Sequence, residues 1–270
     1  MTNKDTTKIV RQRINPSIFD FCFLTTRSHL KAFLRFKQLL KETNAPRKFL
    51  DLGCGYKPFQ QLLGGVNIEK YIGVDFDRNR SAADVEASID QLPFEDNSFD
   101  AVIASEVLEH APQLEKAVGE LRRVAKNGAL VYISTPFILG EHGVPYDFQR
   151  ITRYKYFDLF KKDEIVLLQE TNRSLATPFF IWNVVLENIA IFKMIPIVPH
   201  LSYCVNNIFA LIGEVLVDIA EWVGRRVFSK RQTWFESLWK SYFYTMPGGY
   251  DVIVRIKKYD QGVFGVSLRV

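Results

Sequence analysis

The residues with the clearest chemical meaning form KFLDLGCGYKP, residues 48–58, an apolar run that ends in an acidic, glycine-bearing turn. Two glycines one residue apart let the backbone approach a ligand closely. A dinucleotide-binding G-x-G-x-x-G turn has a third glycine where this chain has Pro58, which argues against a bound pyrophosphate. The carboxylate of Asp51 repels phosphate and attracts an ammonium group. The turn therefore predicts a cationic ligand.

A second acidic residue follows the next apolar run. Asp75 lies in YIGVDFD, residues 71–77, twenty positions beyond Gly55. A carboxylate at this distance can accept hydrogen bonds from both ribose hydroxyls, in dinucleotide and methyl-donor folds alike. Asp75 therefore indicates a nucleoside without deciding between the two.

The loop after residue 135 is dense in side chains that could handle protons. His142, Tyr146, Asp147 and Arg150 fall within nine residues. A hydroxyl acceptor would need a general base, for which His142 is the first candidate and Asp147 the second. The alternative is a structural lid with an internal Asp147–Arg150 ion pair and Thr152 as a helix N-cap. The adjacent Glu109-His110 pair is more typical of a hydrogen-bonded structural histidine.

Apolar runs alternating with helical patterns must position these residues. We expect strands at about 48–52, 70–75, 83–87, 99–105, 128–134, 164–169 and 249–256. Such alternation predicts a mostly parallel sheet covered on both faces. The clearest helix has Pro112 in its first turn and ends at Asn127-Gly128. Its predicted buried stripe is Leu114, Val118, Leu121 and Val124.

The N-terminal segment is basic, and we treat residues 1–47 as a helical arm. Residues 1–48 hold 11 Lys and Arg against 3 Asp and Glu. This excess could attract nucleic acid, anionic lipid or a phosphorylated substrate. The apolar spacing over residues 28–42 favours instead an amphipathic helix with a solvated basic face.

Residues 176–244 read as a helical insertion that contains all four tryptophans: Trp182, Trp222, Trp234 and Trp239. Prolines and charges interrupt its apolar runs, so we expect no membrane-spanning helix. A polar stripe that includes Asn207, Glu214 and Asp218 would allow peripheral membrane contact, but its acidic character favours a buried cap. Residues 259–270 form a tail.

Three well-separated cysteines predict no disulfide framework and a reducing compartment, and they give no support for a metal site. The N-terminus lacks the apolar core of a secretory signal. We therefore expect a cytoplasmic protein without a bound metal, in possible peripheral contact with a membrane.

DLGCGYKP, YIGVDFD, LPFEDNSFDAV and EVLEH occur in an order that closely resembles the class I S-adenosylmethionine-dependent methyltransferases, in particular the type 11 subgroup. The resemblance covers about 48–170 and 249–258, and implies a doubly wound, seven-stranded, Rossmann-like α/β sheet with a last antiparallel strand. It implies a methyltransferase domain over 48–258, with the insertion before the last strand. The cofactor-binding residues it implies are Asp51, Gly53, Cys54, Gly55, Asp75, Phe76, Ser88, Ile89 and Ser105.

One residue departs from the family pattern. Relatives commonly have an acidic residue at the position of Ser88, where it bonds the adenine amino group. A serine hydroxyl can still accept that bond, and the Ile89 N–H could serve a ring nitrogen.

The resemblance implies methyl transfer from S-adenosylmethionine to a hydroxyl or amine of a small molecule, glycan or lipid-linked acceptor. One alternative is a cofactor-binding scaffold protein without turnover. An RNA methyltransferase is disfavoured because no RNA-binding module is recognisable, so nucleic acid is an unlikely partner. A nicotinamide-dependent dehydrogenase fits Asp75 but conflicts with Pro58 and Asp51.

Overall fold

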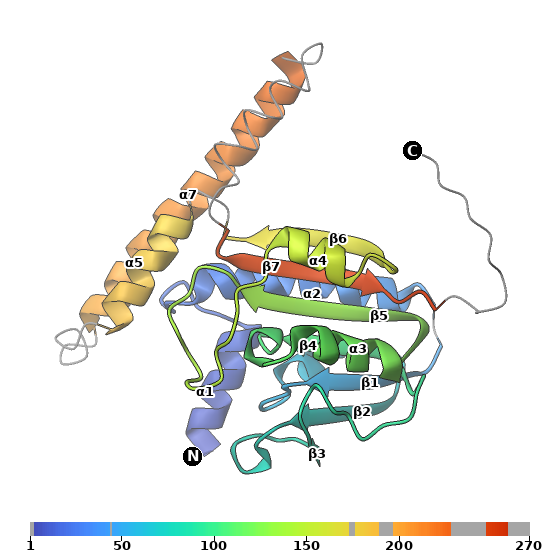
Figure 1. Cartoon of the computed structure of the whole chain (residues 1–270). Coiled ribbons are helices and arrows are strands. Elements are labelled where there is room, and N and C mark those ends of the chain that lie inside the picture. The colour runs from blue at the N-terminus through green and yellow to red at the C-terminus, as the bar shows by residue number, and fades with distance from the viewer. Residues whose placement is uncertain (1–2, 44, 173–175, 189–196, 228–246, 259–270) are drawn as a thin grey trace.

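A computed structural model describes residues 3–43, 45–172, 176–188, 197–227 and 247–258. Its centre is a seven-stranded sheet in the order β3-β2-β1-β4-β5-β7-β6 (Figure 1). The pairings among β1 to β5 are parallel, and β7 runs antiparallel to β5 and β6. The strands are β1 (Arg47–Leu52), β2 (Ile68–Asp75), β3 (Val85–Glu86), β4 (Phe99–Ser105), β5 (Ala125–Pro136), β6 (Glu164–Thr171) and β7 (Gly249–Arg255). The predicted doubly wound α/β sheet is confirmed.

Helices cover both faces of the sheet because successive strand residues point to opposite sides. Leu50 belongs to the core under α3 (Leu114–Val124) and α4 (Arg153–Leu159), whereas Phe49 packs with α2 (Phe23–Lys41) and the 3-10 helix Pro58–Leu63. Tyr132 on β5 contacts the rings of Phe33, Phe36 and Phe59 in this second core. Residues from the N-terminal segment and from the sheet therefore share one core. Two more 3-10 turns, Arg78–Arg80 and Leu108–His110, follow β2 and β4.

The predicted strands agree closely with the observed ones, but the predicted end of α3 is wrong. The helix ends at Val124, and β5 begins at Ala125. Asn127 and Gly128 therefore lie inside a strand. Ala125 already pairs with Phe99 on β4, and the pairing register then shifts past Gly128, whose φ is 81°. The Asn-Gly pair therefore lies at the shift in the β4–β5 pairing register and does not end the helix.

Helix α1 (Asn3–Ile14) precedes α2 and contacts it, and it also contacts the 3-10 helix after β1. Asp20, in the connection to α2, accepts hydrogen bonds from Arg11 at 3.0 and 3.1 Å and from the Ser17 N–H at 2.7 Å. The pKa of Asp20 is lowered because these bonds outweigh its partial burial. The connection thus holds α1 near the carboxyl end of β1.

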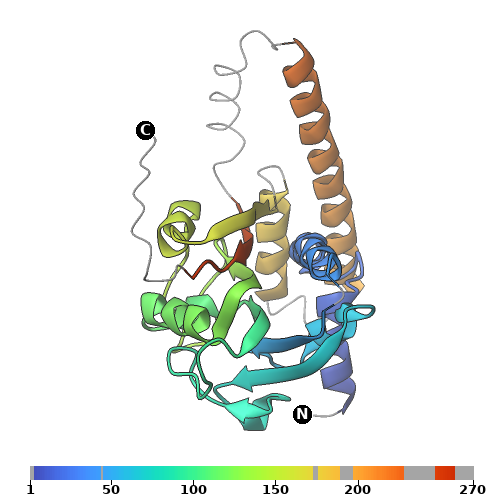
Figure 2. The same cartoon turned by 90° about the vertical axis from the view of Figure 1, so that its right-hand side faces the viewer.

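The insertion contains two described helices, α5 (Thr177–Asn188) and α7 (Ile197–Val227), which contact each other extensively. Both views show α7 extending past the sheet (Figures 1 and 2). Within it, Pro199–Ile219 has a mean hydropathy of 1.4 and is 22% buried, so by length and composition it could cross a membrane. Pro199 does not interrupt this helix, because it lies in the first turn, where proline is tolerated. Trp234 and Trp239 and the predicted tail 259–270 lie outside the described residues.

The polar stripe of α7 faces the protein body. Asn207 is fully buried and donates to the backbone carbonyls of Ile18 and Asp20 at 2.7 and 3.2 Å. Glu214 accepts a hydrogen bond from Arg27 of α2 at 2.9 Å. The exposed side is apolar and consists of Leu201, Val205, Ile208, Phe209, Ile212, Val215, Leu216, Ile219 and Trp222, which are 44–62% exposed. The expectation of a buried cap is therefore wrong for this face.

We expect Asn207→Ala to destabilise the fold by about 2–3 kcal/mol, because it leaves buried polar groups without partners. The Asn183 amide, which donates to Asn207 at 3.0 Å, would lose its acceptor as well. Urea unfolding measures the change. Asn206→Ala is the matched control, since Asn206 is only partly buried and donates to Asn183 alone among the described hydrogen bonds. Equal losses in both variants would contradict the assignment.

Candidate functional site

The carboxyl ends of β1 and β4 meet at one edge of the sheet, beside a cavity of about 260 Å³. Ligands of open parallel sheets bind at this edge, where the strand order reverses. The cavity is lined by five residues of the predicted cofactor set, Asp51, Gly53, Cys54, Gly55 and Ser105, together with Tyr56, Pro58, Phe59, Glu106 and the α1 residues Ile9, Val10 and Arg13. The fold thus brings the first acidic turn and the end of β4 together.

Asp51 is the buried acid of this cavity. Only 2% of the residue is exposed, and one carboxylate oxygen accepts a hydrogen bond of 2.6 Å from the Tyr71 hydroxyl. Burial raises the pKa of Asp51 to about 7, against the opposing effects of Tyr71 and Lys57. A cationic group in the cavity would restore its charge.

Gly53 and Gly55 both have positive φ values, 61° and 47°. A Cβ on Gly53 would lie 2.5 Å from Cγ2 of Val107, so the turn can pass here only with glycine. Cys54, between them, is buried, and burial next to Asp51 raises the pKa of its thiol to about 12. The turn therefore offers backbone and a neutral thiol to a ligand.

Asp75 ends β2 next to the glycine turn. Its carboxylate accepts a 3.0 Å hydrogen bond from the Gly55 N–H, which fixes its position relative to the turn. The next residue, Phe76, is 65% exposed, and its ring centroid lies 5.5 Å from that of Tyr146. Phe76 and the loop after β5 thus approach each other on the outer side of Asp75.

The remaining cofactor residues predicted from the sequence lie on either side of this region. Ser105 shares a 2.8 Å hydrogen bond with Ser134 across β4 and β5. Ser88 and Ile89 follow β3 and do not line the cavity. The Ser88 hydroxyl donates to Asp90, an acidic side chain two residues later that sequence reasoning did not consider.

Sequence reasoning missed the contribution of α1. Ile9, Val10 and Arg13 line the cavity, so the basic arm forms part of the site and brings a guanidinium group to it. No motif marks this segment; only its charge does.

A buried polar network lies behind the cavity. His29 of α2 approaches Asp251 of β7 at 2.7 Å and Glu106 at 3.7 Å. Tyr132 also donates to Asp251, at 2.9 Å. Burial disfavours charge on His29, but the two carboxylates outweigh it, and the pKa of His29 is raised. This network places Glu106 at the cavity wall and was invisible in the sequence because its members lie far apart.

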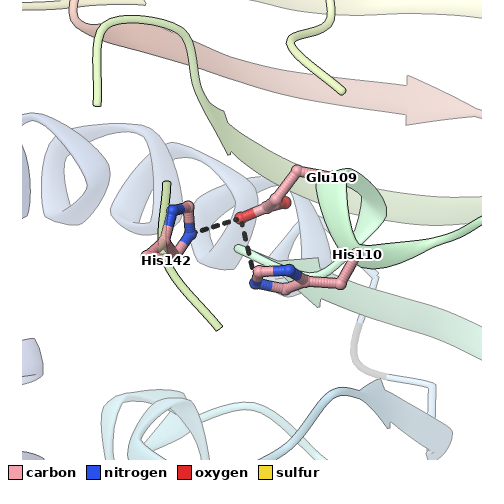
Figure 3. Close-up of side chains that lie close together, drawn as sticks. All are labelled: Glu109, His110 and His142. Carbon is pink, nitrogen blue, oxygen red and sulfur yellow. Dashed lines mark ion pairs between the residues drawn. The ribbon is translucent and has the colours of Figure 1, made fainter. Parts of the chain in front are cut away.

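The loop after β5 is held by an ion pair. Arg150 donates to Asp147 at 2.6 and 2.8 Å and holds the pKa of that carboxyl well below its usual range. The alternative of an internal ion pair is confirmed, as is Thr152 as the N-cap of α4. Nε2 of His142 lies 3.7 Å from a carboxylate oxygen of Glu109, and the proximity of this carboxylate raises the pKa of the imidazole despite its partial burial. Figure 3 shows His142 and His110 next to the same carboxylate oxygen of that glutamate.

The sheet order, the acidic ends of β1 and β2 and the glycine turn define a Rossmann-like α/β domain with a nucleoside-type ligand site. Residues 50–133 match a family model described as a methyltransferase domain. A sterol 24-C-methyltransferase of Gibberella zeae is 33% identical over 42% of this chain and 34% of its own length. An uncharacterized methyltransferase of Mycobacterium leprae is 34% identical over 36% of this chain and 40% of its own.

Among solved structures, a methyltransferase from Archaeoglobus fulgidus aligns over 92% of this chain and 99% of its own, with a TM-score of 0.48 and 13% identity. The chain carries a class I S-adenosylmethionine-dependent methyltransferase domain of the type 11 group, as predicted, and S-adenosylmethionine is the cofactor this domain indicates. The match spans about a third of the length of the sterol methyltransferase and under half of the mycobacterial relative.

Proposed function

We propose that this protein transfers a methyl group from S-adenosylmethionine to a hydroxyl or amine of a lipid-linked acceptor at a membrane surface. The observation that supports cofactor binding most strongly is the buried, protonatable Asp51 facing a cavity beside a glycine turn. Such a carboxylate is costly to keep in an apolar site unless a cationic partner binds there.

Each cofactor-site residue would have a specific task. Asp51 would bind the amino group of the cofactor, and Arg13 would face its carboxylate. Asp75, oriented by the Gly55 N–H, would accept hydrogen bonds from the ribose. Phe76 would pack on the adenine, with Ser88 and Ile89 at its edge. Cys54 and Ser105 would line the same pocket.

The bound cofactor supplies an activated methyl group, so the protein must chiefly align the acceptor and exclude water. Helix α1, which lines part of the cavity, would exclude water there. An amine acceptor needs no further activation. A hydroxyl acceptor needs a general base. His142, in the loop after β5, would be this base, and Asp147 would orient its imidazole.

The exposed face of α7 is the main reason to propose a lipid acceptor. This face is apolar from Leu201 to Trp222, while Asn207 and Glu214 face the body. A patch of this kind marks a membrane or partner surface. The basic N-terminal segment, which contacts α7 through α2, favours an anionic lipid surface. Two relatives named as sterol methyltransferases are consistent with a lipid acceptor.

The test is methyl transfer from labelled S-adenosylmethionine into separated lipid, glycan and polar-metabolite extracts. We expect label in the lipid fraction. Label in an aqueous fraction alone would contradict the lipid acceptor but keep the enzyme. Cofactor binding without label in any fraction would support the scaffold alternative.

We expect Ile212→Glu/Leu216→Glu to reduce binding to vesicles of phosphatidylcholine and phosphatidylglycerol by more than about 100-fold, because two apolar contacts of about 2 kcal/mol each are lost. Flotation measures the bound fraction. The control is Tyr154→Glu/Phe157→Glu on α4, which also replaces two exposed aromatic or aliphatic side chains.

Sedimentation distinguishes the alternative, in which the apolar face is an interface between copies of this chain. In that case the wild type is a dimer, Ile212→Glu/Leu216→Glu is a monomer, and neither protein binds vesicles. That result would overturn the membrane assignment.

A further inference from the structure

Glu109 is a buried carboxylate with no hydrogen-bond partner for either oxygen among the described residues. It lies in the 3-10 turn after β4, three residues beyond Glu106 of the cavity wall. Burial raises the pKa of Glu109. A fully enclosed acid without hydrogen bonds is costly, and such groups in proteins are paired or coordinate metals.

Two imidazoles, whose ring centroids lie 5.0 Å apart, approach one oxygen of this carboxylate (Figure 3). Nε2 of His142 lies 3.7 Å and Nε2 of His110 lies 3.8 Å from the same oxygen of Glu109. One ligand atom from each of the three residues falls within 4.8 Å of the others. Metal–ligand bonds of about 2.1 Å separate neighbouring ligand atoms by about 3–3.5 Å, so a small contraction would complete a site.

The other ring nitrogen of each histidine, Nδ1, lies next to an oxygen acceptor, as it does in histidine ligands of metals. Nδ1 of His110 lies 2.6 Å from the carbonyl oxygen of Tyr146. Nδ1 of His142 lies 3.2 Å from the carbonyl oxygen of Gly140 and 3.3 Å from a carboxylate oxygen of Asp147. Because a carbonyl oxygen only accepts, each Nδ1 carries a proton, and in the neutral ring the lone pair is on Nε2, where a metal ion can take it. This arrangement orients histidine ligands of metals.

We propose that Glu109, His110 and His142 bind a divalent first-row transition metal ion, such as Mn²⁺, Co²⁺ or Zn²⁺. Two imidazoles and one carboxylate favour these ions over Mg²⁺ and leave coordination positions open. An acceptor hydroxyl at an open position would lose its proton more readily, since metal binding lowers the pKa of a bound oxygen. This activation of the acceptor rests on the proposed function, and it makes His142 a metal ligand instead of a free base. Binding of the metal ion does not depend on the proposed function.

The sequence prediction of a protein without metal considered the cysteines and took His110 as structural. The site has no cysteine, and its ligands come from two loops 32 residues apart that only the fold brings together.

The test is titration of metal-stripped full-length protein with Co²⁺, followed by visible absorption and calorimetry. We expect one ion per chain and an unfolding temperature that rises by several degrees on loading. Glu109→Gln and His142→Ala should weaken binding at least about 100-fold. His200→Ala, which removes a histidine of α7 bonded to the Phe19 carbonyl, should bind as wild type does.

The alternative is that Glu109 and the two histidines form a structural ion pair, in which case Glu109→Gln would lower the unfolding temperature of metal-free protein. The metal site predicts otherwise. Without metal, Glu109→Gln should not lower the unfolding temperature, because it removes a buried charge without hydrogen bonds. A marked fall, with no saturable binding of one Co²⁺ by wild type, would overturn the proposal. Co²⁺ binding without methyl transfer would leave the metal site standing and remove the proposed function.

Discussion

Asp51→Asn is expected to lower the affinity for S-adenosylmethionine by about 30- to 100-fold. The substitution keeps the shape of the side chain but removes the charge that would pair with the amino group of the cofactor, and a charge-assisted hydrogen bond in such a site contributes about 2–3 kcal/mol. Calorimetry at neutral pH measures the loss.

The folded protein should tolerate this change. Asp51 is buried and its pKa is raised by burial, so a neutral amide fits the unliganded site well. We therefore expect no fall in the unfolding temperature of the unliganded variant. Tyr71→Phe is the control, because it removes the 2.6 Å hydrogen bond to Asp51 and keeps the ionisable carboxyl group. An Asp51→Asn variant with wild-type affinity would show that the amino group binds elsewhere.

The affinity for S-adenosylhomocysteine should fall about ten-fold per pH unit as the pH drops below 7. In the free protein the pKa of Asp51 is about 7, because burial and Asp75 favour the neutral form against Tyr71 and Lys57. Below pH 7 the carboxyl is protonated, and binding of an ammonium group must release that proton. The affinity therefore rises with pH through 7 and then levels off.

Calorimetry between pH 5.5 and 7 in buffers of different ionisation enthalpy counts the released proton. The ligand amino group stays protonated in this range, so its own titration adds little. We expect close to one proton released at the acidic end and none in Asp51→Asn. A flat pH profile in the wild type would contradict a cation-binding role of Asp51.

Much of the sheet could be predicted from the sequence because its strands are short apolar runs bounded by turn residues. β2 ends at Asp75, and β1 and β4 end one residue before Gly53 and Glu106, as the sequence indicates. The end of α3 could not be predicted, because Asn127-Gly128 is as typical of a helix end as of the strand irregularity that it forms.

The orientation of α7 is a harder case. Periodicity separates a polar stripe from an apolar one but does not say which of them faces the protein. The insertion was expected to be a buried cap, whereas only the stripe with Asn207 faces the protein, and the Asn207 amide bonds carbonyls of the segment after α1. Only the partners of a polar residue decide this, and those partners lie 187 or more positions away.

The candidate site shows the same limit. Asp51, Gly53 and Gly55 are neighbours in sequence, and their type and spacing indicate a ligand directly. Arg13, His29 and Asp251 belong to no motif, and long-range packing alone places them near Glu106 and the cavity. Glu109 was visible as part of EVLEH, but its burial without hydrogen bonds was not.

The most direct test of the central claim is calorimetric titration of the full chain with S-adenosylmethionine at pH 7.5. The cavity beside Asp51 and the glycine turn predicts saturable binding of one molecule per chain, weakened at least about 30-fold by Asp51→Asn. No binding, or binding that is indifferent to Asp51→Asn, would contradict the assignment of this cavity as the cofactor site.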